Sequence, residues 1–152
     1  MVFLCWGNIC RSPMAERVAQ VWANREGLTG VTFTSAGTSS EELGEPMDRR
    51  ARGVLDRAGY SSGGHRAHQI DAAELRSADL VIGMEDLHLK LARRLVPEAD
   101  NLALLTDFDP AAEPGSGVPD PWYGSESGFN ATLASIEAAM PGVLTRVREL
   151  AR

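Results

Sequence analysis

The segment from Val2 to Arg11 constrains the fold of this chain more than any other part of it. Three apolar residues, Val2–Leu4, precede a short loop, and helical spacing of apolar residues begins at Arg11. A short apolar run that leads through a tight loop into a helix is typical of a buried strand in an α/β sheet. Gly7 and Asn8 in the loop tolerate the left-handed backbone conformations that a tight turn requires. These residues predict a strand–loop–helix unit.

The same alternation of apolar segments and helical spacing continues along all 152 residues. Strands are expected at residues 2–4, 31–35, 79–84 and 101–105. Helices are expected to begin at Arg11, Pro46 and Leu87. A fourth, amphipathic helix is expected over residues 129–150, with a bend at Pro141–Gly142. Such alternation with short connections implies right-handed crossovers and a parallel sheet covered on both faces. The length suits a single α/β domain over residues 1–152.

The charge and the cysteine content exclude several classes of protein. Fifteen Lys and Arg residues against 21 Asp and Glu give a formal net charge of −6, which opposes binding to nucleic acid or to an anionic membrane surface. No apolar stretch approaches the ~20 residues of a membrane span. Two cysteines, both within the first ten residues, cannot make a disulfide framework. We therefore expect a cytoplasmic protein without a membrane span.

Residues 5–12 have the composition expected of an oxyanion site. Loop amides at a helix N-terminus form a nest for phosphate or a related oxyanion, and the Arg11 guanidinium adds positive charge. The same positive field favours the nucleophilic thiolate form of Cys5, and the Ser12 hydroxyl is placed to donate a hydrogen bond to it. The candidate substrate-binding residues in this loop are Trp6, Gly7, Asn8, Ile9, Cys10 and Ser12.

A second candidate site segment lies in the irregular stretch 109–127, which is too long to be a simple connector. Asp120 is suited to protonate a leaving group above an anion site, and Trp122 and Tyr123 to wall a cleft on which a substrate ring stacks. Asp109 is a rival acid, but it lacks the aromatic pair that follows Asp120.

With these motifs, the chain resembles the low-molecular-weight protein tyrosine phosphatases, in their bacterial form. The resemblance covers nearly the whole length and is carried by CWGNICRSPMAE at 5–16, SAGT at 35–38, HRAHQI from His65, and DPWYG at 120–124. It implies a four-stranded parallel sheet flanked by helices on both faces, of flavodoxin-like or Rossmann-like topology. It also implies hydrolysis of phosphotyrosine through a phosphocysteine intermediate.

The resemblance assigns roles to individual residues. Cys5 attacks phosphorus, Arg11 and the loop amides hold the equatorial oxygens, and Asp120 protonates the leaving phenol and later acts as the base for water. Asn8 shapes the loop, and Ser35 and His65 are supporting hydrogen-bond partners. No cofactor and no metal are implied. The implied partners are tyrosine-phosphorylated proteins and, more specifically, a cognate tyrosine kinase.

The chain departs from the usual family pattern at the rim of the expected site. Position 6 is Trp, where relatives more often have a smaller or aliphatic residue. Glu41 and Glu42 occupy a loop that often brings an aromatic residue to the rim, and an acidic rim is expected to disfavour acidic phosphopeptides.

Other functions fit the residues less well. Arsenate reductases of this type need further cysteines, and the chain has none after Cys10. Arginine-phosphate phosphatases tend to carry Thr where this chain has Ile9, whose apolar surface suits a phenyl ring better. A non-catalytic phosphate-binding module would need neither the thiol of Cys5 nor the acid of Asp120. A zinc site made of Cys5, Cys10, His65 and His68 matches no familiar ligand spacing.

Several residues have a simpler structural interpretation. Cys10 is either a buried small apolar residue or, as the family implies, a thiol that traps oxidised Cys5 in a reversible disulfide. Met14, Met47, Met84 and Met140 are expected in the core, whereas His68, His88 and the pairs Arg49–Arg50 and Arg93–Arg94 are expected at the surface.

Overall fold

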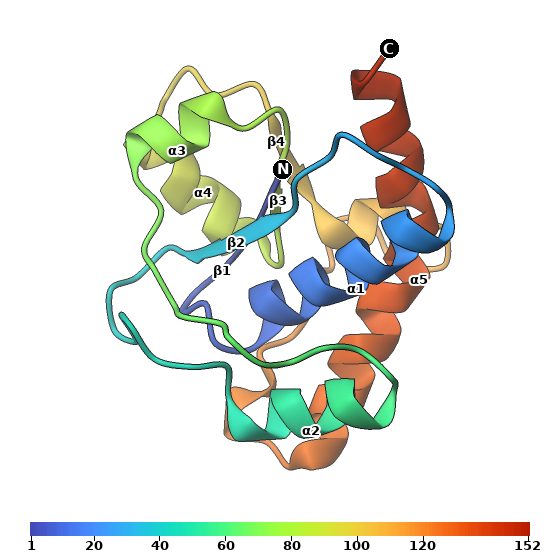
Figure 1. Ribbon diagram of the computed structural model, residues 1–152. Coiled ribbons are helices and arrows are strands. Elements are labelled where there is room, and N and C mark those ends of the chain that lie inside the picture. Colours follow the sequence, from blue (N-terminus) through green and yellow to red (C-terminus); the bar gives the residue numbers. More distant parts are fainter.

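A computed structural model describes residues 1–152 as one parallel sheet packed between helices (Figure 1). The strands are β1 (Val2–Cys5), β2 (Thr34–Gly37), β3 (Val81–Gly83) and β4 (Leu102–Leu104). The helices are α1 (Arg11–Arg25), α2 (Arg49–Arg57), α3 (Ala72–Ser77), α4 (Asp86–Leu95) and α5 (Glu126–Leu150), with 3₁₀ turns at Leu105–Phe108 and Pro121–Tyr123. The strand order is β2-β1-β3-β4, and all pairs are parallel. The expected α/β fold with a four-stranded parallel sheet is confirmed.

The two faces of the sheet are covered by different helices, as the alternation of side chains along β1 requires. Phe3 belongs to the larger apolar cluster, which contains buried residues of α1, α2 and α5. Val2 and Leu4 belong to a smaller cluster with Leu75 of α3 and Ala92 of α4. Both faces of the central strand are therefore buried, which explains its uninterrupted apolar sequence.

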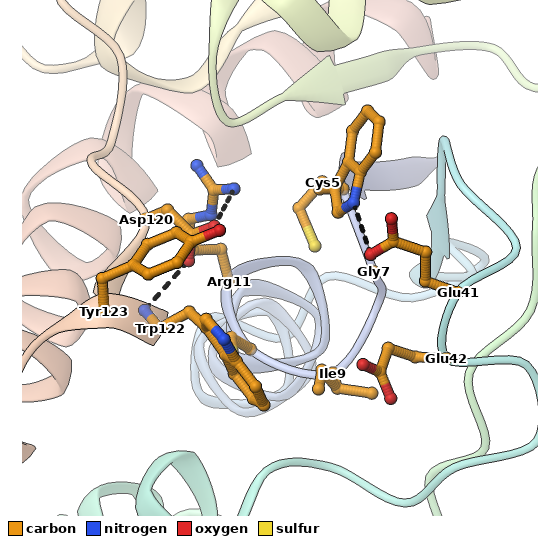
Figure 2. Close-up of a pocket in the computed structure, with 11 residues that line it drawn as sticks. Cys5, Gly7, Ile9, Arg11, Glu41, Glu42, Asp120, Trp122 and Tyr123 are labelled. Carbon is orange, nitrogen blue, oxygen red and sulfur yellow. Dashed lines mark hydrogen bonds and ion pairs between the residues drawn. The ribbon is translucent and has the colours of Figure 1, made fainter.

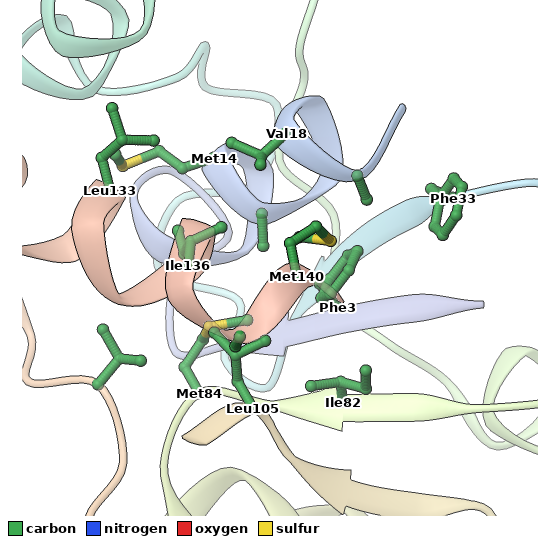
Figure 3. Packing of buried hydrophobic residues seen from close by; sticks show 14 of the residues in the cluster. Phe3, Met14, Val18, Phe33, Ile82, Met84, Leu105, Leu133, Ile136 and Met140 are labelled. Atoms are coloured by element: carbon green, nitrogen blue, oxygen red, sulfur yellow. The ribbon is translucent and has the colours of Figure 1, made fainter. Parts of the chain in front are cut away.

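The larger cluster is built around α5. Ile136 and Met140 of this helix are fully buried and lie between α1, which contributes Met14, and the sheet, which contributes Phe3 (Figure 3). The ring of Phe3 also stacks on that of Phe33, with centroids 6.4 Å apart. Each large apolar side chain buried in this way contributes about 1.5–3 kcal/mol to stability. The four methionines expected in the core, Met14, Met47, Met84 and Met140, are all buried.

The strand order determines where a ligand can reach the sheet. From β1 the chain crosses through α1 to β2 on one side, and it later returns to β3 on the other side. In open parallel sheets, the crevice for ligands lies at the carboxyl end of the strand where the order reverses. Here that position is the end of β1, at Cys5. No helix of the chain has the length together with the apolar character that crossing a bilayer demands.

The second strand lies further along the chain than its sequence indicates. The β-branched run 31–35 predicts the strand, whereas the paired residues are Thr34–Gly37. The strand ends in small residues because the loop after β1 passes directly over it. A Cβ on Gly37 would lie 2.9 Å from the carbonyl oxygen of Trp6 and 3.3 Å from the Cβ of Asn8. Close approach to the loop therefore decides the composition of β2 at this end.

The expectations for α2 and α4 are partly wrong, and α3 has no counterpart among the expected helices. Leu87, Leu91 and Leu95 predict the position of α4 correctly, but Leu87 and Leu95 are exposed, and the helix packs through His88, Leu89 and Ala92 instead. The short helix α3 was not expected, and α2 begins at Arg49 rather than at Pro46. Helix α2 begins after Asp48 because the side chain of Asp48 caps its N-terminus, accepting a hydrogen bond from the Arg50 amide at 2.8 Å.

The last helix, α5, is continuous from Glu126 to Leu150 and contains Pro141 and Gly142, the position at which the sequence predicts a bend. Gly142 has a packing role at this point. A Cβ there would lie 2.5 Å from the carbonyl oxygen of Phe108, in the 3₁₀ turn after β4. The glycine thus allows α5 to approach the backbone of that turn.

We predict that Gly142→Ala lowers the free energy of unfolding by about 1–3 kcal/mol, because the added methyl group overlaps backbone atoms that cannot move aside. Urea denaturation measures this change. The matched control is Gly53→Ala in α2, where the nearest atom to the new Cβ is the mobile end of Arg57 at 3.3 Å. The control is expected to be neutral or stabilising by up to ~1 kcal/mol. Equal effects at the two positions would contradict the packing argument.

Candidate active site

The loop between β1 and α1 turns at Asn8, the only residue other than glycine with a positive φ, 60°. Asparagine tolerates this left-handed conformation better than most residues. The turn directs residues 6–10 across the carboxyl end of β1 and up to the first turn of α1. A compact loop at a helix N-terminus is the geometry in which backbone N–H groups bind an oxyanion.

Asn8 is fully buried, and its side chain holds three other segments against the loop. Its Nδ2 donates to the hydroxyl oxygens of Ser12 at 2.9 Å and Ser35 at 3.0 Å, and its Oδ1 accepts from the His68 backbone amide at 3.0 Å. The backbone carbonyl of Asn8 lies 2.6 Å from Nε2 of His65. A carbonyl only accepts, so His65 carries its proton on Nε2, and burial lowers the pKa of this histidine.

Ser12 connects this network to the candidate nucleophile. Its Oγ lies 2.9 Å from Sγ of Cys5, and both side chains are buried. Ser12 accepts a hydrogen bond from Asn8, and its own proton can be donated to the Cys5 sulfur at 2.9 Å or to the Ala36 carbonyl at 3.4 Å. A hydroxyl that donates to a sulfur stabilises the thiolate form, which is the nucleophilic one. The structure thus brings the Ser12 hydroxyl and the Cys5 sulfur within hydrogen-bonding distance.

Arg11 lies on the other side of the loop, and 2% of it is exposed. Its Nη1 donates to the backbone carbonyl of Val118 at 2.9 Å and forms an ion pair with Glu85. Its Nη2 lies 3.5 Å from the carboxylate of Asp120. The guanidinium therefore joins the loop after β1 to the segment that carries the candidate acid, although the two are more than one hundred residues apart in the sequence.

Sequence reasoning missed Glu85. The residue lies two positions after the end of the buried strand β3, at the same edge of the sheet as Cys5. A polar residue in that position is a signal for a site residue in a parallel sheet. Its partner His88 was expected at the surface, which is wrong: the residue is 1% exposed. The backbone amide of Glu85 donates to Nδ1 of His88 at 3.0 Å, which starts α4 next to Arg11.

Most of the residues expected in the site line one cleft of about 300 Å³ (Figure 2). Its lining consists of Cys5, Trp6, Gly7, Ile9, Cys10, Arg11, Glu41, Glu42, Asp120, Trp122 and Tyr123. Asp120 and Tyr123 lie on one side of the Cys5 sulfur, and Glu41 and Glu42 lie on the other. Asn8, Ser12, Ser35 and His65 do not line the cleft but support the loop from behind.

Asp120, and not Asp109, faces the cleft. The Oδ1 of Asp120 accepts a hydrogen bond from the Trp122 amide at 3.0 Å, so the carboxylate caps the 3₁₀ turn that carries the aromatic pair. Asp109 instead accepts from the Ala111 amide at 2.9 Å, outside the cleft. The irregular segment before α5 thus delivers one carboxylate close to Arg11 and Cys5.

The rim of the cleft is acidic. Nε1 of Trp6 donates to Glu41 at 3.1 Å, which holds that carboxylate at the rim, and Glu42 lies beside Gly7. Arg11 is the only basic residue in the lining. Arg11 is buried and already paired with carboxylates, so it adds little positive charge to the rim. The accessible rim of the cleft, outside the loop between β1 and α1, is therefore negatively charged.

The remaining cysteine and the two histidines of the HRAHQI segment do not form a metal site. Burial, and secondarily the negative charge of Asp48, raises the pKa of the Cys10 thiol, so it stays protonated. The ring of His65 is bound to the Asn8 carbonyl, and the ring of His68 lies 3.0 Å from Glu74. No group of three His, Cys, Asp or Glu side chains is arranged to hold a metal ion.

A parallel α/β sheet with a cysteine and an arginine on one anion-binding loop, opposite an aspartate, defines a cysteine-dependent phosphatase. A profile described as "Low molecular weight phosphotyrosine protein phosphatase" matches residues 1–152. The chain belongs to this family, whose members hydrolyse phosphotyrosine, and the family implies the phosphocysteine mechanism.

Sequence relatives and solved structures agree with this membership. The chain is 42% identical over 145 residues to low molecular weight protein-tyrosine phosphatase A of Mycobacterium tuberculosis, covering 94% of this chain and 88% of the relative. It is 42% identical over 152 residues to a low molecular weight protein-tyrosine-phosphatase of Streptomyces coelicolor, covering 97% and 92%. The structure of an Entamoeba histolytica protein tyrosine phosphatase superposes with a TM-score of 0.91 at 29% identity, over 97% of this chain and 96% of that one.

The buried His88 leads to a prediction about pH. Burial, together with the positive charge of Arg11, lowers the pKa of His88 from 6.5 to about 3 in the folded protein. The unfolded chain therefore binds more protons below about 6.5, so the free energy of unfolding falls as the pH falls, by at most ~1.4 kcal/mol per pH unit from this group. We predict that His88→Asn, whose Oδ1 still accepts from the Glu85 amide, reduces this slope between pH 6.5 and pH 4.

Denaturant unfolding at several pH values measures the slope. The matched control is Leu87→Asn, because Leu87 is an exposed residue of the same helix that carries no titratable group, so its replacement is expected to leave the slope close to that of the unmodified chain. A His88→Asn slope equal to that of the control would show that His88 does not titrate as a buried neutral group.

Proposed function

We propose that phosphotyrosine hydrolysis in this chain depends on three residues of the cleft: Cys5 as nucleophile, Arg11 as phosphate ligand and Asp120 as acid and base. The observation that carries the proposal is that all three line the same cleft, with Ser12 bonded to the Cys5 sulfur and Arg11 3.5 Å from Asp120.

The first step transfers the phosphoryl group to the enzyme. The Cys5 thiolate donates an electron pair to phosphorus, the new S–P bond forms, and the bond from phosphorus to the phenol oxygen breaks. Asp120 gives its proton to the departing oxygen, so tyrosine leaves as the neutral phenol. Arg11 and the loop amides stabilise the charge that builds on the three equatorial oxygens.

The second step releases phosphate. A water molecule attacks phosphorus, the Asp120 carboxylate accepts the proton of that water, and the S–P bond breaks to restore the thiolate. Asp120 ends the cycle protonated and ready for the next substrate. No cofactor is required to balance either step.

The rest of the cleft favours an aromatic phosphate. The backbone of Trp6, Gly7, Asn8, Ile9 and Cys10 forms the phosphate cradle, and Ser12 supports the thiolate. Trp122 and Tyr123 are placed to stack on the substrate ring, and the Ile9 side chain offers it an apolar contact. Ser35 and His65 hold the cradle in position through Asn8.

Tyrosine-phosphorylated proteins are the proposed substrates, and a cognate tyrosine kinase is the proposed source of them. A cytoplasmic location suits this chemistry, because a nucleophilic thiol must stay reduced and both cysteines are free. Inorganic phosphate and related oxyanions are the expected active-site ligands.

Parallel assays with an aryl phosphate, a phosphotyrosine peptide, a phosphoserine peptide and phosphoarginine test the proposal. We expect turnover of the two aromatic esters only. Cys5→Ser is expected to abolish turnover and to keep measurable binding of phosphate or vanadate, because the cradle and Arg11 remain. Retained turnover in Cys5→Ser would remove Cys5 from the mechanism, and preferential turnover of phosphoarginine would identify a different substrate class.

For Asp120→Ala, we predict a loss of turnover that depends on the leaving group. General-acid catalysis is typically worth about 10²–10⁴-fold, and a strongly acidic phenol needs little of it. The loss is measured as kcat/KM, which reports the first step alone, because Asp120 also serves the second step, whatever the leaving group. This loss is expected to be large for phenyl phosphate and small for an activated aryl ester such as p-nitrophenyl phosphate. An equal loss across a series of phenols would assign Asp120 a structural role, and Asp109→Ala is the comparison for that case.

The acidic rim predicts a preference among phosphopeptides. We expect kcat/KM to be about fivefold higher for a phosphotyrosine peptide flanked by Arg than for one flanked by Asp, since an exposed charge pair contributes roughly 0.2–1 kcal/mol. The ratio should fall in Glu41→Gln/Glu42→Gln and with rising salt. Asp100→Asn is the control, because it removes an exposed carboxylate before β4, at the opposite end of the sheet. A ratio that is unchanged in the double variant would contradict the effect of the rim.

A further inference from the structure

Arg50, in the first turn of α2, was expected to be a solvated surface residue, and the structure shows otherwise. Its Nη1 donates to the backbone carbonyls of Trp122 and Gly124, both at 3.2 Å. These two carbonyls belong to the 3₁₀ turn that follows Asp120. The guanidinium of Arg50 therefore binds the backbone of the segment that carries the proposed acid.

The guanidinium of Arg50 also lies close to two aromatic rings. Its central carbon lies 5.2 Å from the ring centroid of Trp122 and 4.6 Å from that of Phe129, in the first turns of α5. A cation near two aromatic rings gains electrostatic attraction and loses little freedom. Arg50 thus contacts the cleft wall through a ring and through two carbonyls at once.

Asp48 anchors Arg50 from the opposite side. Nε and Nη2 of Arg50 donate to the two carboxylate oxygens of Asp48, each at 3.1 Å. Burial alone would raise the pKa of Asp48, but the hydrogen bonds and the charge of Arg50 outweigh it and lower the pKa. The backbone amide of Asp48 donates to the carbonyl of Ile9 at 2.8 Å. The chain of contacts thus starts in the phosphate-binding loop itself.

The segment around Asp120 is held on its other side as well. The carbonyl of Val118 accepts from Arg11 at 2.9 Å, and the amide of Val118 donates to the Met84 carbonyl at 2.7 Å. Asp120 therefore lies between two residues whose backbone carbonyls are bound by arginines: Val118, bound by Arg11, and Trp122, bound by Arg50. The Trp122 amide, which bonds the Asp120 carboxylate at 3.0 Å, belongs to the part that Arg50 holds.

We propose that Arg50 is a positioning residue for the proton donor: it holds the turn after Asp120 against the phosphate-binding loop so that the carboxyl group meets the leaving oxygen. Arg50 touches neither the phosphate-binding amides nor Cys5, and it acts through Trp122 and Asp120. The proposal rests on the proposed role of Asp120 as general acid.

The test compares Arg50→Gln and Arg50→Lys with the matched control Arg49→Gln. Arg49 is the neighbouring residue in α2, is exposed, and carries the same charge. We expect Arg50→Gln to lower kcat/KM for phenyl phosphate by roughly tenfold to a hundredfold, part of the ~10²–10⁴-fold that a general acid supplies. It should change kcat/KM for p-nitrophenyl phosphate by less than about twofold, since kcat/KM reports only the step in which the leaving group departs. The inhibition constant of inorganic phosphate should stay within about twofold, because the cradle is intact.

Arg50→Lys keeps the charge but loses the planar fork, so it is expected to resemble Arg50→Gln rather than the unmodified chain. Thermal unfolding of each variant shows whether it is folded. If Arg50→Gln does not fold, Arg50→Lys tests the positioning role in its place. Arg49→Gln is expected to show no leaving-group dependence.

A double variant separates this proposal from the role of Asp120. If Arg50 acts through the acid, Arg50→Gln should have almost no further effect on phenyl phosphate turnover in the Asp120→Ala background. Independent, multiplying effects on kcat/KM would overturn the proposal, as would a uniform loss of kcat/KM across all leaving groups. If the loss in Asp120→Ala does not depend on the leaving group, the proposed acid is wrong. If the loss in Asp120→Ala depends on the leaving group but the losses in both Arg50 variants do not, the acid stands and only the positioning role of Arg50 is wrong.

Discussion

The active site depends first on one buried side chain, Asn8. Its left-handed backbone turns the phosphate-binding loop, and its amide group bonds the Ser12 and Ser35 hydroxyls and the His68 backbone. Removing the side chain would leave buried polar groups without partners, at a cost of about 1–3 kcal/mol each. Because Ser12 then bonds the Cys5 sulfur, the shape of the loop and the reactivity of the thiol rest on the same network. Loop geometry and nucleophile chemistry are therefore not separable in this protein.

The second requirement is that two distant segments meet across a narrow cleft. Two arginines make this connection: Arg11 reaches the carbonyl of Val118, and Arg50 reaches those of Trp122 and Gly124. A guanidinium has five donors in a fixed plane, so it can bind several carbonyl and carboxylate oxygens at once. The irregular segment before α5 has little regular structure of its own, and these contacts supply the rigidity that a proton donor needs.

The fold itself was largely predictable because its signals are local. The apolar run before Cys5, the helical spacing after Arg11 and the long amphipathic helix each report the environment of neighbouring residues. Expectations failed where a contact between distant residues decided the outcome. The register of β2 follows from the loop that passes over Gly37. Helix α4 buries His88 while Leu87 and Leu95 stay exposed, because the histidine accepts the Glu85 amide beside Arg11.

By itself, the sequence determined the class of fold and the family, and it predicted the loop after β1 and the segment around Asp120 as parts of one site, because residue type and spacing within a few positions carry that information. Only the tertiary structure decided which groups surround the two charged centres of the site. Glu85, the Val118 carbonyl and Arg50 come from three separate segments, and nothing in their local sequence states that they converge on Arg11 and Asp120. Such contacts are determined by the packing of the sheet and helices, since ion pairs and hydrogen bonds form between whichever groups that packing brings within about 3 Å.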